Sequence, residues 1–322
     1  MRQLIATQKT DIAIATYGLT KRYDRYIAVN EVDLRIPRGE IYGLMGVNGA
    51  GKTTMMKMLA AAEAPTKGEI YLNSDRLLLD GSSSNIKRYL GYLPDNYPLY
   101  DDLTVWNYLD YFARLYKIPH RRRRVRVYEV LELVQLEEKR NSLIPTLSRG
   151  MKQRLSLART IIHEPIVLLL DEPISGLDSI ARNQFRSIIR VLQEAGMTIV
   201  IASPILRDLI EVCTTIGIME YGFLVDNFVL ADVERQGATP EIIITILEDL
   251  TALEKELSQN TLVEEWQKLP NQNSVRVKFL GGKQDSAKLL RSLINKGFSV
   301  TEFKQIEADL ETIILNRRKP IN

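Results

Sequence analysis

The chain has 322 residues, with 43 Lys and Arg against 40 Asp and Glu, so its formal net charge is only +3. This length suits one large domain or two unequal ones, and the balance of charge argues against a dedicated nucleic-acid binder. The single cysteine, Cys213, excludes an intramolecular disulfide framework and a cysteine-based zinc cluster. No apolar run approaches the ~18–20 residues that span a bilayer, and residues 1–10 lack the apolar core of a secretory signal. We therefore expect a cytosolic protein.

A buried strand is predicted at Ile41–Met45, which is apolar and runs into Gly46–Thr54. That segment, GVNGAGKTT, matches G-x-x-x-x-G-K-[ST] and precedes a helix-favouring stretch, Met55–Ala62. Glycines let backbone N–H groups close around phosphate oxygens, and the helix N-terminus adds a favourable dipole. The residues expected around the phosphates are Asn48, Gly49, Ala50, Gly51, Lys52, Thr53 and Thr54. The strand before and the helix after disfavour the alternative, a chance match in a glycine-rich turn.

A second buried strand is predicted at Ile166–Leu170, which ends in Asp171 and Glu172. Acids at the carboxyl end of such a strand lie where ligands bind in open α/β sheets. Asp171 suits the water shell of Mg²⁺, and Glu172 suits a general base that orients the attacking water. The alternative, two solvated acids, is less consistent with so apolar a strand. A third strand is predicted at Thr198–Ala202, and the alternation of strands and helices favours an α/β domain with a largely parallel sheet.

Beyond Gly222 the pattern changes. Thr239 as N-cap and Pro240 at the first helical position predict a helix over Thr239–Lys268. The apolar residues that we expect on its buried face are Ile242, Ile246, Leu250, Leu253 and Leu257. After Pro270, we expect a strand at Val275–Phe279, a helix at Asp285–Lys296, a strand at Phe298–Lys304 and a helix at Ala308–Asn316. These patterns predict a nucleotide-binding domain at 1–222, a connector strand and helix at 223–270, and a small α+β domain at 271–322.

Two further blocks lie around the second strand: Leu147–Arg154 (LSRGMKQR) before it and Ser175–Asp178 (SGLD) after it. In this order, the set resembles the nucleotide-binding subunit of an ABC transporter, with the first block similar to the LSGGQ signature and the second to the D-loop. Tyr23 matches the aromatic residue that stacks on adenine in this family, and Leu90–Asp95 occupies the Q-loop position. The resemblance covers roughly residues 12–222.

The resemblance implies a P-loop NTPase fold with a helical subdomain at about 96–160, and a head-to-tail dimer that sandwiches two ATP molecules. Ser148 and the Gly150 backbone of one chain would face the γ-phosphate held by the other chain, which places a helix N-terminus opposite phosphate. The nucleotide contacts implied outside the phosphate loop are Tyr23, Ser148, Gly150 and Asp178. The implied catalytic residues are Glu172, Asp95 and Lys52, and the implied Mg²⁺ ligands are Thr53, Asp95 and Asp171.

Three positions depart from the family's pattern. Asp95 stands where glutamine is usual, and it can still accept a hydrogen bond from metal-bound water, although its reach is shorter. Arg149 replaces a glycine of the signature, which the exporter branch tolerates. Pro204 stands after Ser203, where the family carries its switch histidine. Because proline has no donor, we expect the site built on this chain's phosphate loop to hydrolyse ATP slowly.

The segment after the Q-loop is where the family docks the coupling helix of its permease, and the candidate contacts are Tyr97, Leu99, Tyr100 and Leu103. The aromatic residues of this stretch can also be ordinary helix core. The densest charge run, His120–Arg126, opens a predicted helix, Val125–Leu136. A solvated helix face is the favoured interpretation, a contact with anionic lipid or the permease is second, and nucleic acid is third because aromatic residues do not interleave with the arginines.

The signature variant and the C-terminal extension most resemble ATPases of bacterial exporters whose permease is a separate chain. We therefore expect an ATP- and Mg²⁺-dependent ATPase that powers a membrane exporter from the cytoplasmic face of the inner membrane. It would act as a homodimer, or as a heterodimer with a complete ATPase chain, and no nucleic-acid partner is expected. The alternatives are an ATP-gated regulatory clamp with little turnover and a soluble non-transport ABC ATPase. The transported substrate is not indicated.

Overall fold

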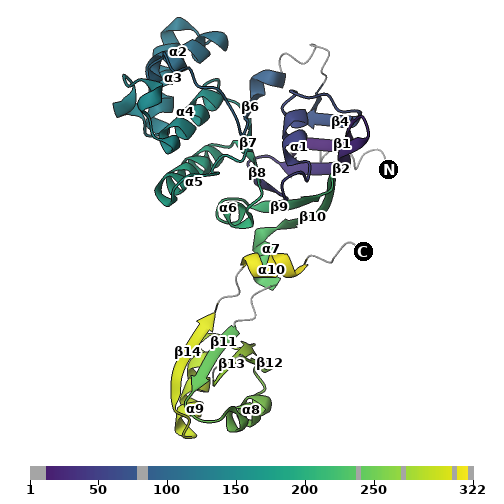
Figure 1. Ribbon diagram of the computed structural model, residues 1–322, viewed down its shortest axis with the longest axis vertical. Coiled ribbons are helices and arrows are strands. Elements are labelled where there is room, and N and C mark those ends of the chain that lie inside the picture. Colours follow the sequence, from purple (N-terminus) through teal and green to yellow (C-terminus); the bar gives the residue numbers. More distant parts are fainter. Residues whose placement is uncertain (1–11, 78–85, 237–240, 270–272, 307–309, 318–322) are drawn as a thin grey trace, which may run out of the picture. The chain divides into compact units, whose positions relative to one another are not determined.

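The computed structural model describes residues 12–77, 86–236, 241–269, 273–306 and 310–317. The chain divides into two compact units, the first ending at Leu230 and the second beginning at Ala231 (Figure 1). The sequence predicts a boundary at residue 222, but β10 (Phe223–Val229) lies beyond it and still pairs with β9 of the first unit.

The central sheet of the first unit has six strands in the order β10-β9-β3-β8-β7-β6. Their bounds are Ile41–Met45 (β3), Leu90–Leu93 (β6), Val167–Asp171 (β7), Thr198–Ser203 (β8), Thr215–Glu220 (β9) and Phe223–Val229 (β10). All neighbouring pairs are parallel except β10 with β9. Every residue of β3, β7 and β8 is buried, which explains why these strands are mostly apolar rather than alternating. The expected α/β domain with a largely parallel sheet is confirmed.

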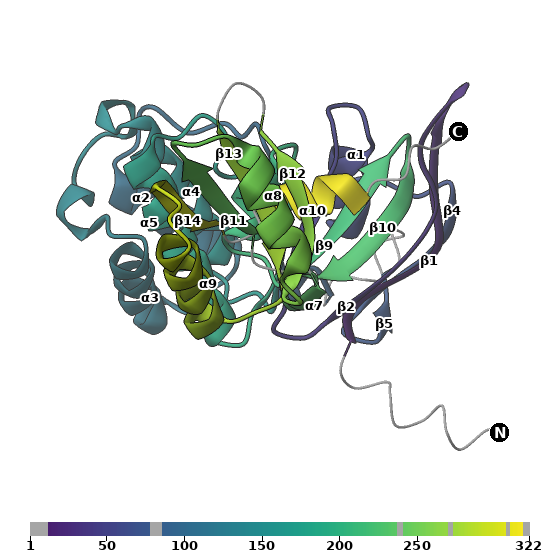
Figure 2. The same ribbon diagram turned by 90° about the horizontal axis from the view of Figure 1, so that it is seen from below.

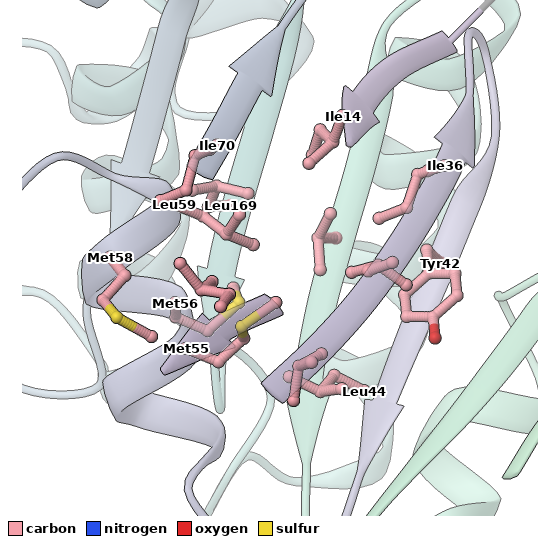
Figure 3. Packing of buried hydrophobic residues seen from close by; sticks show 14 of the residues in the cluster. Ile14, Ile36, Tyr42, Leu44, Met55, Met56, Met58, Leu59, Ile70 and Leu169 are labelled. Carbon is pink, nitrogen blue, oxygen red and sulfur yellow. The ribbon is translucent and has the colours of Figure 1, made fainter. Parts of the chain in front are cut away.

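A second sheet, in the order β2-β1-β4-β5, is antiparallel. Its strands are Ile12–Tyr23 (β1), Tyr26–Pro37 (β2), Lys67–Leu72 (β4) and Asp75–Arg76 (β5). The two sheets share one apolar core with helix α1 (Lys52–Leu59), whose Met55, Met56, Met58 and Leu59 are fully buried (Figure 3). Because this core fixes the start of α1, it also fixes the loop that precedes the helix.

Three helices form a group beside the sheet: α2 (Val105–Leu115), α3 (His120–Leu133) and α4 (Arg149–Ile161) (Figures 1 and 2). Helix α4 also packs against β6 and against α5 (Ser179–Glu194). A short helix, α6 (Leu206–Ile210), follows β8. No helix in the described ranges combines the length and the apolar character needed to cross a bilayer.

The second unit contains a four-stranded antiparallel sheet in the order β12-β13-β11-β14. Along the chain its elements are β11 (Glu241–Ile246), α8 (Leu250–Gln259), β12 (Val263–Lys268), β13 (Ser274–Phe279), α9 (Lys283–Asn295) and β14 (Val300–Ile306). This β-α-β-β-α-β order is the ferredoxin-like arrangement. The alternate residues Ile242, Ile244, Val275, Val277 and Phe279 are completely buried with Leu253, Leu257 and Leu293 of α8 and α9. The unit also includes α10 (Leu310–Arg317) and all of α7 (Leu230–Gln236) except its first residue.

The prediction of a single helix over Thr239–Lys268 is wrong. Its expected cap, Thr239 with Pro240, lies outside the described residues, and Ile242 and Ile246 belong to strand β11 rather than to a helix. The run Ile242–Ile246 is β-branched throughout, which favours a strand, and Ile242, Ile244 and Ile246 are its buried alternate residues. Only the apolar residues from Leu250 onward lie on a helix, α8. The expected connector at 223–270 is therefore not separate, because β11 and β12 are strands of the small domain's sheet and α8 packs in its core.

Candidate nucleotide site

The phosphate loop connects the carboxyl end of β3 to α1. Gly49 and Gly51 have φ values of 86° and 107°, in a region that glycine enters without strain. A Cβ on Gly51 would lie 2.2 Å from the Ala28 carbonyl oxygen, and one on Gly46 would lie 2.5 Å from the Met219 carbonyl oxygen. Neighbouring backbone therefore closes on the loop from β2 and from β9. Of the predicted phosphate-loop residues, Asn48, Gly49 and Thr53 are exposed, while Ala50 and Lys52 are buried.

Lys52 is the first residue of α1, and its side chain turns back into the loop. Its Nζ donates hydrogen bonds to the Gly46 carbonyl oxygen at 2.8 Å and to the Val47 carbonyl oxygen at 3.2 Å. Burial lowers the pKa of Lys52, while the carboxylates of Glu172 and Asp171 act in the opposite direction. The ammonium group is thus held inside the loop, near the two acids that follow β7.

Asp171 is the last residue of β7 and is only 1% exposed. Neither of its carboxylate oxygens has a hydrogen-bond partner among the described residues. Burial raises the pKa of Asp171, the nearby Thr53 and Lys52 side chains oppose the rise, and the carboxylates of Glu172 and Asp95 add to it. A buried carboxylate with free lone pairs is suited to a hard divalent cation or its water shell. Thr53 and Asp95 lie close enough to Asp171 to affect its pKa, and oxygen donors of this kind are those that a hydrated Mg²⁺ prefers.

Glu172 follows directly and is half-buried, with a positive φ of 49°. A non-glycine residue in this region is uncommon and is typical of functional sites. Its amide donates to the Ala202 carbonyl oxygen of β8 at 2.9 Å, and its carbonyl oxygen accepts from the Ser175 amide at 3.2 Å. The backbone of Glu172 is thus fixed to both β8 and the segment that follows, while its side chain reaches partly into solvent.

Pro204 lies between the two halves of the site because β8 runs between β3 and β7. Asp171 pairs with Ala202 and Met45 pairs with Ser203, so all three strands end at the same edge. Pro204 is half-buried there, and the Ile205 amide donates a hydrogen bond to Ser203 Oγ at 3.1 Å. Neither histidine lies at this edge, since His120 begins α3 and His163 contacts the Leu90 carbonyl oxygen at 3.1 Å.

The predicted signature and D-loop residues are at two helix N-termini. Ser148 caps α4 by accepting from the Met151 amide at 3.2 Å, and Asp178 caps α5 by accepting from the Ala181 amide at 2.8 Å. Ser148 and Asp178 are exposed, while Gly150 is buried against Ala181. Exposed N-terminal turns of this kind leave N–H groups available to an anion.

Tyr23 ends β1 and pairs with Tyr26 at the start of β2. Its ring is 41% exposed, and the Lys21 ammonium lies 4.8 Å from the ring centroid. Sequence reasoning missed Tyr26, whose hydroxyl donates to the Gly49 carbonyl oxygen of the phosphate loop at 3.1 Å. The sequence does show a second tyrosine three residues after Tyr23. Its contact with Gly49, however, depends on the geometry of the hairpin between β1 and β2, which the sequence does not show.

The arginine run of α3 is largely paired within the fold. Arg122 and Arg123 form ion pairs with Glu164 and Asp110, each at 2.8 Å. Arg126 donates to the carbonyl oxygens of Ile161 and Ile162 at the end of α4. Arg123 and Arg126 therefore hold α3 to its neighbours, whereas Arg121, Arg122 and Arg124 are exposed.

A phosphate loop and a buried, unpaired aspartate at the carboxyl edge of one parallel sheet define a P-loop nucleotide-binding protein. The family model described as "ABC transporter" matches residues 29–175. The uncharacterized ABC transporter ATP-binding protein YcbN of Bacillus subtilis (strain 168) is 36% identical over 270 residues, which cover 82% of this chain and 84% of that protein. The bacitracin transport ATP-binding protein BcrA of Enterococcus faecalis is 36% identical over 231 residues, 70% of this chain and 72% of BcrA. The chain belongs to the ABC transporter ATP-binding proteins.

Solved structures agree with this assignment. The ATP-binding subunit of an ABC transporter superposes with a TM-score of 0.62 at 28% identity, covering 70% of this chain and 92% of the other. A dimeric post-hydrolysis state of the ATP-binding cassette MJ0796, bound to ADP and phosphate, gives a TM-score of 0.61 at 25% identity, covering 67% of this chain and 98% of that one. The fold is therefore an ABC-type P-loop ATPase domain, and the expected fold and family are confirmed.

Asp171→Asn provides a test of the unpaired aspartate. The cost of burying the Asp171 carboxylate outweighs its favourable interactions with Thr53 and Lys52. We therefore expect the nucleotide-free variant to unfold at a higher temperature, with a free energy of unfolding that is larger by about 1–3 kcal/mol. The gain should be largest at neutral pH and should vanish in acid. A raised carboxyl pKa means that ionised Asp171 destabilises the fold above that pKa, whereas the protonated form does not.

In the same variant, Mg²⁺ should no longer raise the affinity for ATP, as measured by calorimetry with and without the metal. Asp75→Asn, on an exposed edge strand, is the control and should change neither quantity. A loss of stability in Asp171→Asn at neutral pH would contradict the assignment of a strained, unpaired carboxylate.

Proposed function

We propose that this chain is the ATP-hydrolysing subunit of a membrane exporter and that it works by ATP-driven dimerisation at the cytoplasmic face of the inner membrane. The observation that carries the proposal is the strand order β3-β8-β7, which places the phosphate loop and the pair Asp171–Glu172 at one sheet edge. The names of the relatives support transport: BcrA is a bacitracin transport ATP-binding protein, and YbhF of Escherichia coli (strain K12), 34% identical over 232 residues, is a probable multidrug ABC transporter ATP-binding protein.

In this proposal Lys52 exchanges its two loop carbonyls for β- and γ-phosphate oxygens, and the loop amides from Asn48 to Thr54 hold the remaining phosphate oxygens. Mg²⁺, held by Thr53, Asp171 and Asp95, would neutralise developing phosphate charge when bound. Glu172 accepts a hydrogen bond from the attacking water and orients it. Tyr23 offers its exposed ring face to adenine. Ser148, Gly150 and Asp178 complete the site of the opposite chain, so closure of the dimer is needed for each reaction.

Hydrolysis at this chain's own site is slow in this proposal, because Pro204 offers no donor between the phosphate loop and Glu172. A chain of this kind could serve as the slow half of a heterodimer or as both halves of a homodimer. The second candidate function, an ATP-gated clamp with little turnover, is favoured by the same Pro204.

The test of dimerisation uses Glu172→Gln, which removes the base but keeps the shape of the site. With ATP, the purified variant should sediment as a dimer, and with ADP as a monomer. Lys52→Ala on the same background should remain monomeric with ATP. Dimers that form only after a second, different ATPase chain is added would assign the heterodimer. The absence of any ATP-dependent association, with either chain, would contradict the proposal.

The proposed permease contact consists of Tyr97, Leu99, Tyr100 and Leu103. Tyr100 is 42% exposed although it lies against the rings of Tyr108, Tyr111 and Phe112, and the Tyr97 hydroxyl donates to Gln153 Oε1 on α4. This aromatic group is thus anchored to two helices and still offers an apolar surface, a combination found at partner interfaces.

A photo-crosslinking residue at Leu99 should become joined to a polytopic membrane protein in intact cells, identified by mass spectrometry. The same residue at Tyr221, which is 84% exposed, should give no such product. Crosslinking from Leu99 to ribosomal proteins alone would instead favour a soluble non-transport ATPase.

We also propose that the second unit is regulatory or dimerising. The support is that it has its own four-stranded sheet and its own apolar core.

A further inference from the structure

The arginine that departs from the signature pattern makes a contact that a glycine could not make. Arg149 lies between Ser148 and Gly150 at the start of α4, and its side chain turns away from this exposed end toward residues 175–176 of its own chain. Its Nη2 donates a hydrogen bond to the Ser175 carbonyl oxygen at 3.1 Å. The guanidinium also covers Gly176, because a Cβ built on that glycine would lie 2.4 Å from the guanidinium carbon.

A side chain at position 176 would disturb this packing in two ways. The Gly176 φ of +66° is unfavourable for residues with a side chain, and the guanidinium fills the space that a side chain would need. A second close contact lies beside the first, since a Cβ on Gly150 would come 2.7 Å from the Ala181 Cβ of α5. The first turn of α4 is therefore attached to residues 175–181 at two points, one of which is the arginine.

The segment held by Arg149 continues into the acid that follows β7. The Ser175 amide donates to the Glu172 carbonyl oxygen at 3.2 Å, so the same residue that accepts from Arg149 also holds the backbone of Glu172. A path of two hydrogen bonds thus leads from the signature helix to Glu172. It joins an exposed helix end, Ser148–Gly150, to the interior of this chain's own site.

We propose that Arg149 is a positioning residue that couples the two nucleotide sites of the dimer. This role rests on the proposed ATP-driven dimerisation. When the opposite chain's nucleotide binds at the signature turn and orders it, Arg149 also orders Ser175 and the backbone of Glu172. An arginine side chain adds a donor and a planar contact at this point, and both are lost when glycine takes its place. Binding at one site then favours the catalytic arrangement at the other, which is a coupling free energy between sites.

The test compares Glu172→Gln with Glu172→Gln/Arg149→Gly. We expect the ATP concentration for half-maximal dimerisation to rise about fivefold to tenfold in the double variant, within the usual range of site–site coupling. The affinity of the monomer for ADP should change by less than about twofold, because Arg149 makes no contact with its own phosphate loop among the described hydrogen bonds. In the nucleotide-free monomer, amide exchange at Gly176 and Leu177 should become faster, which reports the loss of the contact directly.

A double-mutant cycle with Gly176→Ala distinguishes packing from a general defect. Gly176→Ala alone should weaken dimerisation through both the positive φ and the clash with Arg149. In an Arg149→Gly background the clash is gone, so the added effect of Gly176→Ala should be smaller, and the two changes should not be additive. Arg149→Lys should restore part of the dimerisation, since an ammonium can donate to Ser175 but cannot cover Gly176.

The experiments distinguish a failure of the proposed function from a failure of the proposed role of Arg149. If Glu172→Gln does not dimerise with ATP, the proposed function is wrong and the inference fails with it. If it dimerises normally and Arg149→Gly changes neither the half-maximal ATP concentration nor the exchange at Gly176, only the inference is wrong. Additive effects of Arg149→Gly and Gly176→Ala would likewise overturn it.

Discussion

Pro204→His is expected to raise the steady-state rate of ATP hydrolysis about 10²-fold, which is the usual effect of one well-placed transition-state donor. The reason is the position of the residue. Strand β8 runs between β3 and β7, and its end pairs with Met45 on one side and Asp171 on the other. An imidazole at this point would reach toward the phosphate loop and toward Glu172 together, whereas proline has no donor for either.

The matched controls separate the donor from the backbone effect. Pro204→Ala removes the ring and restores the backbone N–H, but it adds no side-chain donor and should leave turnover unchanged. Pro204→His/Glu172→Gln adds the donor without the base and should remain slow. Turnover of the unmodified chain should be measured with saturating Mg²⁺ and ATP. If that chain already hydrolyses tens of ATP per second and Pro204→His does not increase the rate, slow hydrolysis is the wrong interpretation of Pro204.

Arg186→Met is expected to lower the free energy of unfolding of the first unit by about 3 kcal/mol. Arg186 of α5 forms ion pairs with Asp208 at 3.3 Å and with Glu211, and Arg182 reaches Asp208 at 3.6 Å. Asp208 is only 2% exposed, so removing Arg186 leaves a buried carboxylate with one distant partner. Because α6 begins two residues after Pro204, this network also fixes the chain that leaves the site edge.

Arg207→Met provides the comparison, because Arg207 pairs with the same Glu211 but its side chain is 76% exposed. That variant should lose no more than about 0.5 kcal/mol. Thermal unfolding, followed by a probe in the first unit, should show a drop of roughly 6–12 °C for Arg186→Met and a shift of about 2 °C or less for Arg207→Met. Equal shifts in the two variants would show that burial of Asp208 does not determine the strength of the network.

The sequence correctly predicted those parts of the fold that have strong local patterns. Strands β3, β7 and β8 are dominated by consecutive apolar residues, and each lies within one residue of its expected bounds. In the small domain, the alternation from Val275 to Phe279 gave β13, and Gly297, with φ of 89°, ends α9 as a C-terminal glycine does. Such signals depend only on near neighbours in the chain.

The errors and omissions concern interactions between distant segments. The helix expected from Thr239 failed because Ile242 and Ile246 fit both a helical spacing of four and a strand spacing of two, and pairing with β13 and β14 decided between them. The order of the six-stranded sheet, which places Pro204 between the two halves of the site, cannot be read from any local pattern. Nor can the contacts of Tyr26 with Gly49 or of Arg149 with Ser175, which join residues 23 and 26 positions apart.

The position of the Lys52 ammonium inside the phosphate loop affects how nucleotide binds. The ammonium is already held by the Gly46 and Val47 carbonyl oxygens, and the packed methionines of α1 fix the end of the loop. Folding, rather than nucleotide arrival, therefore orders this lysine. Nucleotide binding then requires only the exchange of these two carbonyl contacts for phosphate oxygens, and differences among nucleotides should appear in how long each remains bound.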